Sequence, residues 1–123
     1  MSKNFKIDET LSRWPKGWAV SEDDIETGNK IVAEMKTFVE SLIEAGLTQK
    51  TIKRHVDNLW LLGGEIIRHV NFDPDQRGKT GLELIKAEVG DDGGPYCRHL
   101  DTEEEMKSFD STARKLHKYL DKK

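Results

Sequence analysis

The chain has 123 residues, the size of one ordinary domain with a single hydrophobic core. Charged and hydrophobic residues each make up 35% of it, which favours a folded globular protein over a disordered one. The net charge of −3 excludes a strongly basic nucleic-acid-binding chain, and no apolar run approaches the roughly 20 residues that span a bilayer. Because Cys97 is the single cysteine and the segment MSKNFKIDET lacks the apolar block of a signal peptide, we expect a cytoplasmic protein.

Helix signals recur along the chain, whereas strand signals do not. Residues 1–20 are predicted to form a short leader with at most one or two helical turns, broken at Pro15 and anchored by Trp14 and Trp18. Apolar residues then repeat at spacings of three and four, which predicts a long amphipathic helix at about 21–45. This segment is acidic, since it holds seven carboxylates and two lysines.

The next helix is predicted at about 49–70, with Thr48 as its N-terminal cap. Its wide apolar face is formed by Ile52, Val56, Leu59, Trp60, Gly63, Ile66, Ile67 and Val70, with Glu65 and Arg68 on the opposite face. Leu61 falls within the polar stripe, which indicates packing by more than one neighbour or by another chain. Gly63 and Gly64 are predicted to let another helix approach closely, with a kink as the second interpretation.

Two further helices are predicted at about 80–89 and 102–121. Each is preceded by a threonine, Thr80 or Thr102, with a glutamate three residues later, the pattern of a capping box. The predicted fold is therefore an all-α, four-helix bundle-like single domain over residues 1–123, with a short N-terminal leader.

No catalytic or cofactor-binding motif is recognisable. The segment RGKTG at residues 77–81 ends like a phosphate-binding loop, but Asp73 stands where the motif needs its first glycine. Cys97, His99 and Asp101 stand at alternate positions without a second cysteine or paired histidine to complete a metal site. We therefore expect no enzyme activity, no cofactor and no metal.

The segment GLTQKTIKRHVDNL, residues 46–59, resembles the start of the second helix in the core-binding domain of tyrosine recombinases. The resemblance lies in a Gly-Leu-Thr turn, a Thr-Ile pair and a basic first turn followed by leucine. In that family the helical domain grips DNA, and a second domain, which we do not expect in 123 residues, carries the catalytic residues. The resemblance implies a related helical topology and a DNA-facing role for Thr48, Gln49, Lys50, Thr51, Lys53 and Arg54. The whole chain also resembles small bacterial proteins of the kind carried on mobile elements.

Two functional hypotheses follow. The first is a non-catalytic helical interaction module that associates with itself or docks on a protein partner. Its predicted interface residues are Leu61, Arg54, Asp57 and Arg68. The alternative is a DNA-binding accessory protein that uses the first turns of the second long helix. We favour the interaction module, because a chain of net charge −3 with few clustered cations binds DNA weakly at physiological salt.

Overall fold

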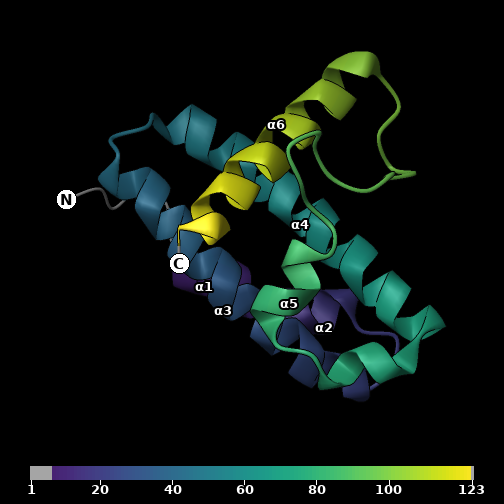
Figure 1. Ribbon diagram of the computed structural model, residues 1–123. Helices are drawn as coiled ribbons and strands as arrows, with labels where there is room; N and C mark the ends of the chain where they lie inside the picture. Colours follow the sequence, from purple (N-terminus) through teal and green to yellow (C-terminus); the bar gives the residue numbers. More distant parts are fainter. Residues whose placement is uncertain (1–6, 123) are drawn as a thin grey trace.

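The computed structural model describes residues 7–122, which lie in helices and their connections, the longest connection being residues 87–102 (Figure 1). The elements are α1 (Ile7–Ser12), α2 (Trp14–Trp18), α3 (Asp23–Glu44), α4 (Gln49–Phe72), the 3-10 helix η1 (Pro74–Gly78), α5 (Gly81–Lys86) and α6 (Glu103–Asp121). Within this range the one strand-like pairing is an isolated antiparallel bridge between Gly90 and Gly93. The predicted all-α class is confirmed. Residues 1–6 of the predicted leader, and Lys123, lie outside the described residues.

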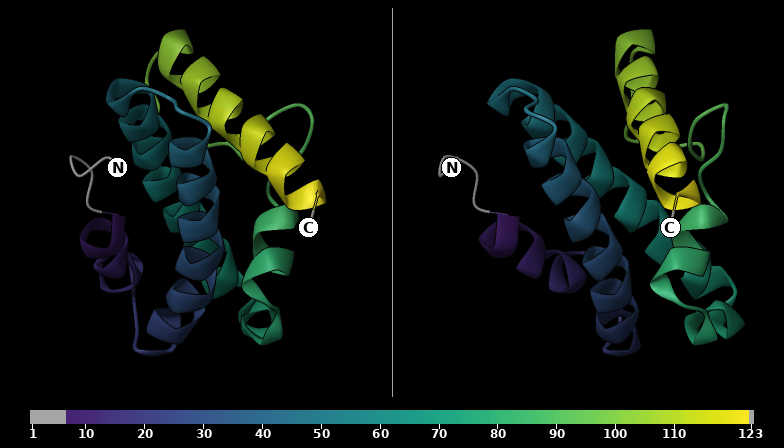
Figure 2. Two further views of the ribbon diagram at one scale, coloured as in Figure 1. Left: turned by 90° about the vertical axis from the view of Figure 1, so that its left-hand side faces the viewer. Right: turned by 60° about the vertical axis from the view of Figure 1, so that its left-hand side comes forward.

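The long helices α3 and α4 form the centre of the molecule. They are joined by a connection of four residues, 45–48, so they pack as antiparallel neighbours. Both views in Figure 2 place α1 and α2 on one side of this pair and α5 and α6 on the other. None of the described helices is both long enough and apolar enough to cross a bilayer.

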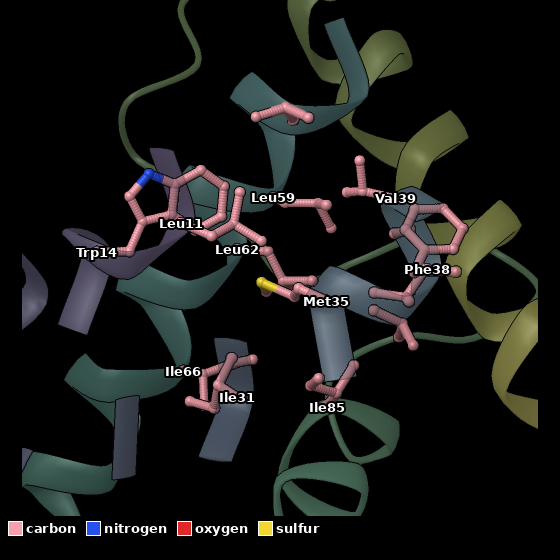
Figure 3. Close-up of a cluster of buried hydrophobic side chains, with 14 of the residues drawn as sticks. Leu11, Trp14, Ile31, Met35, Phe38, Val39, Leu59, Leu62, Ile66 and Ile85 are labelled. Carbon is pink, nitrogen blue, oxygen red and sulfur yellow. The ribbon is translucent and has the colours of Figure 1, made fainter. Parts of the chain in front are cut away.

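One contiguous core joins all six α-helices. Met35 of α3 is fully buried near its centre, with Leu62 of α4 beside it (Figure 3). Leu11 and Trp14 reach the core from the leader helices, and Ile85 reaches it from α5. Burying each side chain of this size contributes roughly 1.5–3 kcal/mol, so the leader helices and α5 gain their order from the core rather than from their own short length.

The starts of α4, α5 and α6 are set by local capping, as the sequence predicts, whereas α3 begins without a side-chain cap. Thr48 accepts a hydrogen bond from the backbone N–H of Thr51 at the start of α4. Thr80 and Thr102 each take part in a complete capping box at the starts of α5 and α6. At the end of α3, Gly46 adopts a φ of 81°, which glycine tolerates without strain. The observed bounds differ from the predicted ones by no more than three residues, the largest difference being at the end of α5.

The prediction for the leader was wrong in one respect. Pro15 does not break a helix but stands in the first turn of α2, where its missing N–H is not needed. The leader thus forms two short helices, and Trp14 and Trp18 are buried anchors as predicted. A Cβ at Gly28 would lie 2.9 Å from the Pro15 Cα, so this glycine lets α2 pack directly on α3.

Candidate functional site

All three tryptophans of the chain meet where α2 crosses α4. The ring centroids lie 5.6 Å apart for Trp14 and Trp18, 5.8 Å for Trp14 and Trp60, and 5.6 Å for Trp18 and Trp60. The indole N–H of Trp18 donates a hydrogen bond to the backbone oxygen of Trp60 at 3.0 Å. Aromatic stacking and this hydrogen bond fix the rings relative to α4, so the cluster is a rigid feature.

The two glycines of α4 have different roles in this cluster. A Cβ at Gly63 would overlap the Cζ2 and Cη2 atoms of the Trp18 ring, whereas a Cβ at Gly64 would lie 3.6 Å from Trp18 Cδ1. Gly63 therefore makes room for the Trp18 side chain of α2 rather than for a close approach of helix backbones, and Gly64 makes only ordinary contacts. The predicted kink is not required either, because α4 runs unbroken from Gln49 to Phe72.

Beside the cluster lies a groove with a volume of about 420 Å³, which we call the tryptophan groove. It is lined by Gly17, Trp18, Val20, Trp60, Leu61, Gly64, Glu65, Ile67, Arg68, Asn71, Phe72, Arg98 and His99. Val20 is 79% exposed, Phe72 76% and Trp60 38%, so large apolar side chains face solvent on its walls. Trp60 was predicted to lie on the buried face of its helix. It remains 38% exposed, although the rings of Trp14 and Trp18 pack against it.

A buried carboxylate forms part of the groove wall. Glu65 accepts two hydrogen bonds from Arg68, from Nε at 3.1 Å and from Nη2 at 2.9 Å, and its side chain is 3% exposed. The prediction that Glu65 lies on the solvated face was wrong, because the loop that holds Cys97 covers this part of α4. Burial raises the pKa of the Cys97 thiol, and the nearby Glu65 acts in the same direction. The guanidinium of Arg68 also lies 5.6 Å from the ring centroid of Phe72, and the exposed Arg98 adds a second cation to the groove.

The four residues of the predicted partner interface do not lie on one surface. Leu61 is partly buried and lines the tryptophan groove together with Arg68. Arg54 instead donates a hydrogen bond to the Ser108 hydroxyl at 2.9 Å, on the side of α4 that faces α6. Asp57 is exposed and pairs with Lys53 at 2.9 Å. Leu61 and Arg68 thus belong to one surface, and the other two residues do not.

The first turns of α4 hold the six residues with a predicted DNA-facing role, which are Thr48, Gln49, Lys50, Thr51, Lys53 and Arg54. Thr48 and Thr51 bond to each other in the helix cap, with 3.0 Å between their hydroxyls. Lys53 is engaged by the neighbouring Asp57. Lys50 and Arg54 are exposed cations, although Arg54 is already oriented towards α6. DNA binding by this surface stays a prediction.

A buried polar network that sequence reasoning missed joins α4 to α6. His55 is 2% exposed, and its Nδ1 lies 2.7 Å from the hydroxyl of Thr112. The same hydroxyl accepts a hydrogen bond from Asn58 at 2.9 Å and donates one to the Ser108 carbonyl at 3.3 Å. The Arg54 guanidinium, which can only donate, faces Nε2, and this favours the tautomer in which Nε2 accepts and Nδ1 donates to Thr112.

This environment keeps the His55 imidazole neutral. Burial is the largest cause, and the positive charges of Arg54 and Lys115 act in the same direction, so that the pKa of His55 is lowered to about 4. The neutral ring fits the tautomer above, with Nε2 lying 3.5 Å from the Arg54 guanidinium. A histidine and an asparagine three positions apart on an apolar face were the sole sequence signal of this network.

A second buried network connects the start of α3 with the end of α4. Asp24 is fully buried and accepts hydrogen bonds from the backbone N–H groups of Val20 at 2.8 Å and Ser21 at 3.3 Å. It also accepts from Asn71 and Arg77, both at 3.1 Å. Burial raises the pKa of Asp24, but these hydrogen bonds together outweigh it and hold the pKa below its ordinary value. The network fixes Val20 and Asn71, which line one end of the tryptophan groove.

The two weak motifs of the sequence have structural roles. In the RGKTG segment the carbonyls of Arg77 and Lys79 accept hydrogen bonds from the Lys30 ammonium at 2.8 and 2.6 Å. That loop therefore presents acceptors to a cation, the opposite of a phosphate-binding loop. Across the side chains of residues 9–122, no three His, Cys, Asp or Glu gather as a metal site would need, and Cys97 is buried.

Comparisons with protein families, with curated proteins and with solved structures found no match to this chain. The resemblance of residues 46–59 to tyrosine recombinases therefore stays a prediction. Inference about function rests on the surfaces described above.

Proposed function

We propose that the protein is a non-catalytic interaction module that docks on another protein through the tryptophan groove. The observation that carries the proposal is the exposure of Val20, Trp60 and Phe72 around one concave surface. Contiguous exposed apolar area of this kind marks interaction sites, because leaving it in water is unfavourable. Tryptophan in a preformed pocket is also a residue type that dominates binding energies at protein interfaces.

The shape of the groove favours an amphipathic helix as its occupant. Trp60 and Phe72 mark positions twelve residues apart along α4, which correspond to about 18 Å at a rise of 1.5 Å per residue. That length matches about three turns of a partner helix, with apolar anchors spaced at three, four and seven residues. A partner that lays such a face into the groove buries its anchors between Trp60, Leu61 and Phe72.

The charges around the groove favour acidic residues on that partner helix. Arg68 and Arg98 both line the groove, and the charge of Arg68 is shared with the buried Glu65. Among residues 9–122, no carboxylate lies within 4.0 Å of the Arg98 guanidinium. Electrostatic complementarity then favours an apolar helix with acidic residues on its flanks over a basic one.

A selection experiment tests this assignment. A displayed library of random peptides of about 16 residues, long enough for four helical turns, is selected on the wild-type protein. We expect enriched peptides to carry apolar residues at three-four spacing with flanking Asp or Glu. Because the only tryptophans of the chain form the cluster beside the groove, their fluorescence then reports peptide binding directly.

Two matched variants locate the binding. Leu61→Glu places a charge in the tryptophan groove, and Leu82→Glu makes the same change at another partly buried leucine, on α5. We expect selected peptides to bind Leu61→Glu at least about tenfold more weakly, because the introduced carboxylate repels acidic peptides and is costly to desolvate. Leu82→Glu is expected to retain binding. Equal binding to wild type and Leu61→Glu would contradict the proposal.

Light scattering separates a foreign partner from a second copy of this chain. On our proposal the purified protein is a monomer whose groove is free. A dimer that Leu61→Glu dissociates would show instead that the groove is filled by a second copy.

A further inference from the structure

A second concave surface lies between the start of α4 and the end of α6, away from the tryptophans. It encloses about 360 Å³ and is lined by Leu47, Thr51, Arg54, His55, Ser111, Arg114, Lys115 and Lys118. We call it the cationic groove. Arg54 and the basic residues of α6 come from opposite walls, so its charge results from helix packing and not from one run of sequence.

The cations of this groove are not neutralised from within. Among residues 9–122, no carboxylate lies within 4.0 Å of the charged nitrogens of Arg114, Lys115 or Lys118. Three acidic side chains on the same two helices are engaged elsewhere. Asp57 pairs with Lys53, Asp110 accepts a hydrogen bond from the backbone of Gly94, and Asp121 lies beside Lys86 and His117. A positive potential is therefore concentrated in a hollow of a chain whose net charge is −3.

The groove also has a fixed polar wall. The hydrogen bond from Arg54 to Ser108 orients its guanidinium before any ligand arrives. The buried His55 supports that wall through Thr112 of α6. Hydroxyl groups of Thr51 and Ser111 add neutral donors to the lining. A planar guanidinium together with ammonium and hydroxyl donors is the set that recognises phosphate oxygens.

We propose that the cationic groove binds a small anion that carries two or more phosphate groups. Its volume is at the lower end of the range for small-molecule sites, so it accommodates a compact ligand. Four cations exceed what a single phosphate needs, and they are distributed over both walls, which favours a ligand with separated negative charges.

Titration with inorganic pyrophosphate tests the proposal. We expect one binding site per chain by calorimetry, and saturable changes in the NMR resonances of the His55 ring, which faces the groove. The variant Arg114→Gln plus Lys115→Gln is expected to bind at least about tenfold more weakly, because it loses two charge-assisted contacts. The control Lys107→Gln plus Lys122→Gln removes the same charge from α6 and its C-terminal cap, outside the groove, and is expected to bind normally.

A short DNA duplex, titrated under the same conditions, distinguishes the source of the phosphates. We expect weak DNA binding that does not displace pyrophosphate. DNA binding that is tighter than pyrophosphate binding and is lost in the same double variant would overturn the assignment to a small ligand. Absence of pyrophosphate binding, or equal binding to wild type and to the Arg114/Lys115 variant, would also overturn it. None of these substitutions touches the tryptophan groove, so the two proposals fail independently.

Discussion

Replacing Gly63 by alanine should destabilise the protein, although the same change stabilises most helices. Alanine in a helix interior is favoured over glycine by about 1 kcal/mol, and α4 extends well beyond Gly63 in both directions. The new Cβ, however, would overlap the ring of Trp18. Helix backbone holds Gly63 on one side, so the indole of Trp18 must move.

The magnitude follows from what Trp18 would lose. Its side chain is buried against Trp14 and Trp60, and its N–H is bonded to the Trp60 carbonyl. Removing a buried tryptophan from its site costs about 3–5 kcal/mol, and the gain in helix propensity offsets about 1 kcal/mol of this. Gly63→Ala should therefore lower the free energy of unfolding by about 2–4 kcal/mol.

Gly64→Ala is the matched control, because its Cβ would lie 3.6 Å from Trp18, an ordinary contact. It should leave the free energy of unfolding unchanged or raise it by up to about 1 kcal/mol. Urea denaturation followed by circular dichroism gives both values, and tryptophan emission should shift to the red in Gly63→Ala alone. Equal stability of the two variants would refute the packing of Trp18 on Gly63.

Three further predictions concern the buried networks and a cap. Asp24→Ala should lower the free energy of unfolding, measured in urea, by about 3 kcal/mol, because two backbone N–H groups and Arg77 lose their acceptor. The control Asp23→Ala, at an exposed position, should change it by less than about 0.5 kcal/mol. Similar losses in the two variants would contradict the network. The pKa of His55 is lowered from about 6.5 to about 4 on folding, so its contribution to stability is present above pH 6.5 and is lost as the pH falls towards 4. Between pH 7 and pH 5 the free energy of unfolding should fall by about 2 kcal/mol for this reason. The fall should be absent in His55→Gln. The wild-type pH dependence in that variant would argue against a buried neutral ring. Thr102→Ala removes the capping hydroxyl of α6 and should lower the free energy of unfolding by about 1 kcal/mol, while an unchanged value would show that the cap is dispensable.

The sequence by itself determined the elements that depend on neighbours along the chain. Thr48, Thr80 and Thr102 were recognisable as caps because a cap joins residues only three positions apart. Gly46 ends its helix for an equally local reason, a positive φ. The three-four periodicity gave most of the core, since it requires one apolar face without specifying what covers it.

Tertiary structure alone decided which segment of the chain covers each face of a helix. Glu65 and His55 are buried because other segments of the chain cover these positions of α4, and the hydrogen-bond partner of His55, Thr112, lies far away in the sequence. Trp60 is part-exposed because the leader helices contact its ring without covering all of it. Both grooves combine residues from elements that are distant in sequence, as the pairing of Arg54 with residues of α6 illustrates. Helical periodicity is a property of one segment, whereas a groove forms where two helices cross. The packing of the whole core fixes that crossing.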